Sequence, residues 1–150
     1  MTTDTPRQPL TGKVALITGG ARRVGAAIAR ELHAAGANVV IHHHRSVDAA
    51  QKLCAELERS RPNSTLRLSA DLLDIASLGA LVEDTRRHFG QLDILINNVG
   101  GRRKDIPTTD MPLETWQELL DLNLTSVFTC TKIIGRSMLD RGQGGRIINI

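Results

Sequence analysis

The chain has 150 residues, of which 41% are hydrophobic and 2% aromatic, and its formal net charge is +3. A chain of this length and hydrophobic content can bury the core of one globular domain. The few aromatic rings, and the lack of any run of Lys and Arg longer than residues 102–104, argue against a nucleic-acid-binding protein. Such a protein would need stacking platforms or a basic stripe.

Residues 1–11 are polar and contain proline, without the apolar stretch of a signal peptide, and we expect them to form a disordered tail. No run approaches the roughly 18 consecutive apolar residues of a membrane-spanning helix, so we expect no membrane association. Cys54 and Cys130 lie far apart within helical patterns and indicate buried, reduced thiols rather than a disulfide framework. These features predict a cytoplasmic protein.

Short apolar runs alternate with amphipathic patterns through residues 12–150, which we expect to form one domain. Runs rich in Val, Ile and Leu predict strands at 13–18, 38–42, 65–69, 92–97 and 145–150. Apolar residues at helical spacing predict helices at 23–35, 47–60, 74–89 and 113–139. Gly36 and Gly90 are predicted to end two of these helices in the left-handed conformation. The alternation predicts an α/β fold, a doubly wound parallel sheet in three layers, with ligands bound beyond the carboxyl ends of the strands.

A glycine-rich segment, Thr-Gly-Gly-Ala-Arg-Arg-Val-Gly at 18–25, follows the first predicted strand. Glycine permits a tight turn and a close approach of the backbone to a pyrophosphate, which the amides of the next helix can hold. Taken alone, the segment is equally compatible with a plain strand-to-helix bend. Its place between the first strand and an amphipathic helix favours phosphate binding.

The second predicted strand ends in the sequence His-His-His-Arg-Ser at 42–46. A carboxylate at this place, about twenty residues past the glycines, would select NAD, whereas a basic residue accommodates the 2′-phosphate of NADP. His44, Arg45 and Ser46 stand there, and Arg45 offers a planar donor fork for phosphate. Adjacent strand residues point to opposite faces, so the three histidines cannot ligate one ion, and we predict NADP(H) and no metal.

The glycine segment resembles the Thr-Gly-x-x-x-Gly-x-Gly pattern of the short-chain dehydrogenase/reductase family. Thr18, Gly19 and Gly25 match, and Arg23 replaces the middle glycine. We expect the replaced position to be helical already, where a side chain is tolerated. Arg22 or Arg23 could then reach over the nucleotide. The resemblance implies a Rossmann-type fold.

Two later segments are similar to further family motifs. Asp71 matches an adenine-contacting aspartate, although a helix N-cap is the alternative and Asp74 is better placed for that role. Asn97-Asn98-Val99-Gly100 matches Asn-Asn-Ala-Gly, which lines the nicotinamide side in the family; its alternative is a simple turn. The resemblance implies cofactor contacts from Thr18, Gly19, Arg22, Arg23, Val24, Gly25, His44, Arg45, Ser46, Asp71, Leu72, Asn98, Val99 and Gly100.

Asn123 matches the helix asparagine of the family's Asn-Ser-Tyr-Lys tetrad, where it orders a water in the proton relay. It is therefore the one catalytic residue that the resemblance implies here, and a surface-facing asparagine is the alternative. The family's catalytic serine and Tyr-x-x-x-Lys pair would follow Ile150, and the chain contains no tyrosine. We expect a portion of a longer enzyme, with a sheet incomplete at its C-terminal side, that binds cofactor and is inactive alone.

Within the family, the first half looks most like the pteridine reductases, with an arginine in the glycine turn, the 42–46 sequence and Arg-Pro-Asn-Ser at 61–64. From Leu113 onward the chain is more similar to 3-oxoacyl-(acyl carrier protein) reductases or sugar dehydrogenases. The implied activity is hydride transfer between NADP(H) and a carbonyl or pterin-like C=N bond of a small molecule. The family also implies a homodimer or homotetramer through the 113–139 helix. Two alternatives remain open: an inactive dinucleotide-binding or regulatory module, and another doubly wound domain such as a methyltransferase.

Overall fold

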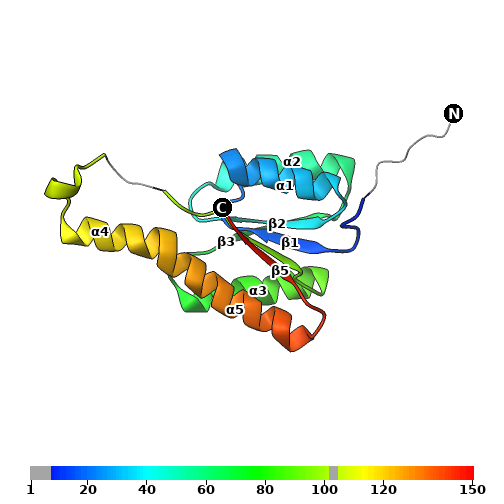
Figure 1. The fold of residues 1–150 in the computed structure, drawn as a ribbon. Helices are drawn as coiled ribbons and strands as arrows, with labels where there is room; N and C mark the ends of the chain where they lie inside the picture. Colours follow the sequence, from blue (N-terminus) through cyan, green and yellow to red (C-terminus); the bar gives the residue numbers. More distant parts are fainter. Residues whose placement is uncertain (1–7, 102–104) are drawn as a thin grey trace.

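The computed structural model describes residues 8–101 and 105–150, which form a parallel sheet between two layers of helices (Figure 1). The strands lie in the order β3-β2-β1-β4-β5, and every neighbouring pair is parallel. They are β1 Val14–Ile17, β2 Asn38–His43, β3 Thr65–Ser69, β4 Ile94–Asn97 and β5 Arg146–Asn149. The predicted doubly wound sheet is confirmed, and the strand order reverses between β1 and β4.

The helices cover both faces of the sheet, with α1 and α2 on one side and α3 and α5 on the other (Figure 1). Their bounds are α1 Arg23–Ala34, α2 Val47–Ser60, α3 Ile75–Phe89, α4 Leu113–Leu120 and α5 Ser126–Arg141. A short 3₁₀ turn, η1 Thr108–Asp110, precedes α4, and a π-helical turn, η2 Asp121–Thr125, joins α4 to α5. Within the described residues, no helix is both long and apolar enough to cross a membrane.

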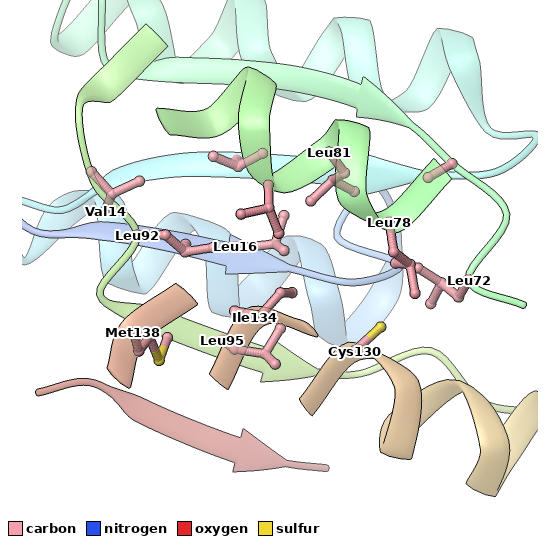
Figure 2. Packing of buried hydrophobic residues seen from close by; sticks show 13 residues of the cluster. Val14, Leu16, Leu72, Leu78, Leu81, Leu92, Leu95, Cys130, Ile134 and Met138 are labelled. Atoms are coloured by element: carbon pink, nitrogen blue, oxygen red, sulfur yellow. The ribbon is translucent and has the colours of Figure 1, made fainter. Parts of the chain in front are cut away.

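Alternation along the strands divides the core into two clusters. Val14 and Leu16 of β1 face α3 and α5, whereas Ala15 and Ile17 face α1 and α2. Figure 2 shows the first cluster, in which side chains of α3 and α5 pack onto β1 and β4. Both faces of the central strands are therefore buried, which explains why their sequences are continuously hydrophobic.

The predicted 113–139 helix is continuous in space but is not one regular α-helix, since η2 interrupts it at Asp121–Thr125. Within η2, the Asn123 Nδ2 donates to the Leu119 carbonyl at 2.9 Å and to the Gly101 carbonyl at 2.9 Å. A side chain that competes for a helix carbonyl and is tied to a distant loop explains the local widening. The helix ends at Arg141, where Gly142 is left-handed with φ 69°.

The predicted ends of the other helices are confirmed. Gly36 and Gly90 are left-handed, with φ 102° and 80°, and the Asp74 carboxylate accepts a hydrogen bond from the Ala76 amide at 3.0 Å as the N-cap of α3.

Part of the segment assigned to a disordered tail belongs to the folded domain. Residues 9–12 form turns, in which the Leu10 amide donates to the Ala35 carbonyl at 2.9 Å and Leu10 packs against the α1–α2 core. A Cβ on Gly36 would lie 2.8 Å from the Thr11 Oγ1, so the segment is also closely packed there. The remaining residues of the predicted tail, 1–7, lie outside the described residues.

Candidate functional site

Two cavities lie at the carboxyl edge of the sheet, where the strand order reverses. The first, of about 450 Å³, is bounded by the glycine turn after β1, the end of β2 and the segment after β3. The second, of about 540 Å³, lies between the glycine turn and the segment after β4. Gly19, Arg22 and Val99 line both cavities, so the two are neighbours. In doubly wound folds this is where ligands bind.

Nearly all the residues predicted to bind cofactor line one of these cavities. The first cavity is lined by Gly19, Arg22, His44, Arg45, Ser46, Asp71, Leu72 and Val99. The second is lined by Gly19, Arg22, Arg23, Val24, Gly25, Asn98, Val99 and Gly100. The structure thus brings together residues that lie far apart in the chain, such as Gly19 and Gly100. Thr18 lies beneath them.

Thr18 and Asn98 fasten the glycine turn to the segment after β4. The buried Thr18 Oγ1 accepts hydrogen bonds from the amides of Asn98 (2.9 Å) and Val99 (3.1 Å), and it donates to the Ile96 carbonyl at 3.3 Å. The Asn98 Nδ2 donates to the carbonyls of Thr18 (3.0 Å) and Gly19 (3.2 Å). Asn98 is therefore more than a turn residue, because its side chain holds two cavity walls together.

The last glycine of the turn is required by close packing. A Cβ on Gly25 would lie 2.6 Å from the Asn98 Nδ2, and it would also clash with the Gly19 carbonyl. Gly19 is left-handed with φ 61°. Both positions therefore need glycine to keep α1 and the turn in this arrangement.

The expectation that Arg23 is already helical holds only in part. Arg23 is the first residue of α1, but its φ of 49° places it in the left-handed region that favours glycine. The position that matches the middle glycine of the family pattern therefore has a backbone conformation that favours glycine. The side chain of Arg23 is exposed at the second cavity, and its left-handed backbone is strained.

The end of β2 presents basic and hydroxyl groups to the first cavity. His44 and Arg45 are exposed, and Ser46 is the N-cap residue of α2 although its hydroxyl makes no capping hydrogen bond. His43 is 5% exposed, and its Nδ1 has no hydrogen-bond partner within the described part of the chain. An unsatisfied buried nitrogen, a free hydroxyl and the positive end of α2 suit an anionic ligand group.

Asp71 faces the same cavity from the segment after β3. Its Oδ1 accepts a hydrogen bond from the Leu73 amide at 3.0 Å, whereas Asp74 caps α3, so the N-cap alternative for Asp71 is excluded. Leu72 is buried and forms an apolar floor beside it. A polar rim over an apolar floor is typical of a site that receives a planar base with polar edges.

A sequence profile described as short chain dehydrogenase matches residues 13–150. The chain belongs to the short-chain dehydrogenase family. It is 39% identical to a 3-oxoacyl-[acyl-carrier-protein] reductase of Synechocystis sp., over 94% of this chain and 56% of that protein. It is 37% identical to the hydroxynaphthalene reductase arp2 of Aspergillus fumigatus, over 93% of this chain and 50% of that protein.

A solved structure supports the same assignment. The short chain dehydrogenase from Burkholderia cenocepacia J2315, crystallised in complex with NADP, superposes with a TM-score of 0.83 at 36% identity, over 93% of this chain and 55% of that one. The chain spans about half the length of the curated relatives it matches. The family assignment removes the methyltransferase alternative.

Asn123 of this short-chain dehydrogenase does not line either cavity. Its Oδ1 accepts from the Gly101 amide at 2.9 Å, while its Nδ2 donates to the carbonyls of Gly101 and Leu119. The residue is exposed, yet its side chain ties η2 to the loop that follows β4. A Cβ on Gly100 would lie 3.0 Å from the Asn123 Oδ1, so this contact also needs a small residue there.

The sequence analysis missed the far wall of the first cavity, which consists of Glu118, Asp121, Leu122 and Ser126. These residues recur at helical spacing on one face of the α4–η2–α5 rod. That spacing was visible in the sequence, but nothing in the sequence showed which face of the rod meets the sheet edge. His42 was also missed as a site residue, because it was considered only as a metal ligand.

Proposed function

We propose that this short-chain dehydrogenase binds NADP(H) and forms the cofactor-binding part of a reductase. The observation that carries the proposal is the chemistry at the end of β2. His44, Arg45 and Ser46 line the first cavity where an NAD-selective site would have a carboxylate. Arg22 lines the same cavity from the glycine turn and adds a second guanidinium group to it.

The two cavities suggest which part of the cofactor each group of residues would bind. Arg45 and Ser46 would hold the 2′-phosphate, Asp71 and Leu72 the adenine, and the amides at the start of α1 the pyrophosphate. The second cavity, with Asn98 and its neighbours, would receive the nicotinamide side. When bound, NADP(H) supplies or accepts the hydride, and the protein positions it.

For the substrate we propose a carbonyl compound. The Synechocystis relative reduces a 3-oxoacyl group and the Aspergillus relative a hydroxynaphthalene, according to their names. A pterin-like C=N bond is the second candidate, but one of its sequence signs has a structural explanation. In the 61–64 segment, the Arg61 guanidinium donates to the carbonyls of Gly36 (2.8 Å) and His33 (3.2 Å), at the edge of the sheet opposite the cavities. That segment therefore carries no information on substrate.

We also propose self-association through the rod formed by α4, η2 and α5. Leu113, Trp116, Leu124 and Phe128 are 75%, 50%, 63% and 63% exposed along it. A row of exposed large apolar side chains marks a protein interface. Sedimentation velocity should show a dimer or tetramer, and Phe128→Glu should shift it to the monomer. A monomeric wild-type protein would contradict this assignment.

Cofactor selectivity tests the main proposal. We expect NADP⁺ to raise the melting temperature of the chain, and calorimetry to show NADP⁺ binding at least about tenfold tighter than NAD⁺, as one or two charge-assisted hydrogen bonds allow. Arg45→Asp should abolish that preference, because it replaces a side chain that binds the 2′-phosphate of NADP by a carboxylate that can bond the ribose 2′-hydroxyl of NAD. Lys52→Asp is the matched control, since it reverses an exposed charge on α2 away from the cavity. Equal losses for both cofactors in Arg45→Asp would refute the phosphate assignment.

A further inference from the structure

His42 is a buried residue at the end of β2 that connects both walls of the first cavity. It is 1% exposed. Its Nδ1 lies 3.1 Å from the Gly19 amide and its Nε2 lies 3.0 Å from the Ala70 carbonyl. Its own main-chain carbonyl accepts from the Gly20 amide at 3.0 Å. One residue thus holds two successive amides of the glycine turn and the segment that leads into Asp71.

These partners allow only one form of the imidazole ring. The Gly19 amide is a donor, so the Nδ1 must accept, and the Ala70 carbonyl is an acceptor, so the Nε2 must carry the proton. The neutral Nε2–H tautomer satisfies both contacts. The imidazolium would set an N–H group against the Gly19 N–H group and lose that hydrogen bond.

The electrostatic surroundings of the ring come from every wall of the cavity. Besides the neighbouring His43 and His44, Arg22 of the glycine turn lines it, as do Asp71 after β3 and Glu118 and Asp121 from the α4–η2 rod. Burial is the largest influence on His42 and lowers its pKa. The hydrogen bond to the Ala70 carbonyl and the charge of Asp71 act in the opposite direction, and the neighbouring histidines lower the pKa further. The neutral form is therefore the one present near pH 7.

We propose that His42 is a positioning residue: its neutral ring fixes the glycine turn relative to the Ala70–Leu72 wall, and protonation of the ring releases the turn and weakens cofactor binding. β2 lies between β1 and β3, so a side chain at its end is placed to set the width of the cavity between them. The inference rests on the proposed function, since it takes the dinucleotide as the ligand. It adds a pH dependence that the phosphate-binding residues alone do not supply.

Two substitutions separate positioning from bulk packing. Asparagine can place its Oδ1 close to the position of the Nδ1, so His42→Asn keeps an acceptor for the Gly19 amide and removes the titrating group. His42→Leu fills the space without any acceptor. By calorimetry at pH 7.5, with folding verified by circular dichroism, we expect His42→Leu to weaken NADP⁺ binding about tenfold or more and His42→Asn about threefold or less.

The pH dependence of NADP⁺ affinity is a second test, because a residue that only fills space would not affect it. Because burial lowers the pKa of His42, NADP⁺ affinity of the wild-type chain should fall more steeply than that of His42→Asn as the pH is lowered below the ordinary histidine value of about 6.5. The wild-type chain and His42→Asn differ only at residue 42, so the difference between the two profiles isolates His42. Parallel profiles, or unchanged binding by a folded His42→Leu, would overturn the proposal.

Direct observation of the ring keeps the proposal testable if a variant does not fold. Imidazole ¹⁵N spectra of the wild-type chain should show an unprotonated Nδ1 and a protonated Nε2 on His42 at pH 7.5, and the opposite tautomer would refute the inference. If the spectra agree but the wild-type chain binds no NADP⁺, the proposed function fails on its own. If NADP⁺ binds and the profiles are parallel, only the role of His42 fails.

Discussion

Replacing Thr18 by valine should destabilise the chain through two main-chain amides. The Thr18 Oγ1 is the hydrogen-bond acceptor for the Asn98 and Val99 amides, and valine replaces this oxygen with a methyl group of similar size. Both amides are partly buried, and leaving each of them without a hydrogen-bond partner costs about 1–2 kcal/mol. Thr18→Val should therefore lower the free energy of unfolding by about 2–4 kcal/mol, or the melting temperature by roughly 5–15 °C for a chain of this size.

Thr18→Ser is the matched control, because it keeps the hydroxyl and loses only a methyl group, at a cost of about 1 kcal/mol. The measurement is urea unfolding followed by circular dichroism, with the slope compared among the three proteins to confirm that only stability changes. Thr18→Val should also weaken NADP⁺ binding more than Thr18→Ser, since the glycine turn then loses its attachment to the segment after β4. If the two variants differ by less than about 0.5 kcal/mol, the hydroxyl does not hold these amides as described.

Two further effects follow from backbone strain and from buried histidine. Arg23→Gly should raise the free energy of unfolding by about 0.5–1 kcal/mol, since Arg23 is left-handed at φ 49°. Asn63 is left-handed at φ 57°, but asparagine tolerates this region, so Asn63→Gly should raise the free energy of unfolding by less. Equal increases in the two variants would contradict the explanation. Burial lowers the pKa of His33 in the folded chain, so the folded state binds fewer protons than the unfolded one. The free energy of unfolding should be highest above a pH of about 6.5 and should fall as the pH drops from there through the lowered pKa of the folded state. The fall should be smaller in His33→Gln. A free energy of unfolding that stays constant from pH 7.5 to 5 would refute this.

Local periodicity was sufficient to predict the architecture. Each strand is a run of β-branched and aliphatic residues, and each of the first three helices carries a regular apolar stripe, so their bounds agree with the prediction to within two residues. The glycine caps and the Asp74 N-cap were also predictable, because these residues act on the backbone beside them. The same reasoning predicted a ligand site at the carboxyl edge of the sheet, and two cavities lie there.

Features that depend on contacts between distant segments could not be predicted in this way. The π-helical turn exists because Asn123 bonds Gly101, twenty-two residues earlier, and the helical pattern of 113–139 contains no trace of that loop. The left-handed Arg23 was missed because an arginine near a helix start looks like an ordinary helical residue. The role of His42 depends on the register of β1 against β2, which sets its ring opposite Gly19.

The site separates residues that shape it from residues that would recognise its ligand. Thr18, His42 and Asn98 are wholly or partly buried and hold main-chain groups of the fold, so a change at any of them alters stability and binding together. His44 and Arg45 are exposed, and within the described part of the chain their side chains make no such attachment. Exposed substitutions of this kind usually change stability by less than about 0.5 kcal/mol. If His44 and Arg45 recognise the cofactor as proposed, we expect the choice between NADP and NAD to vary within this fold at little cost in stability, whereas a change in the shape of the glycine turn should carry such a cost.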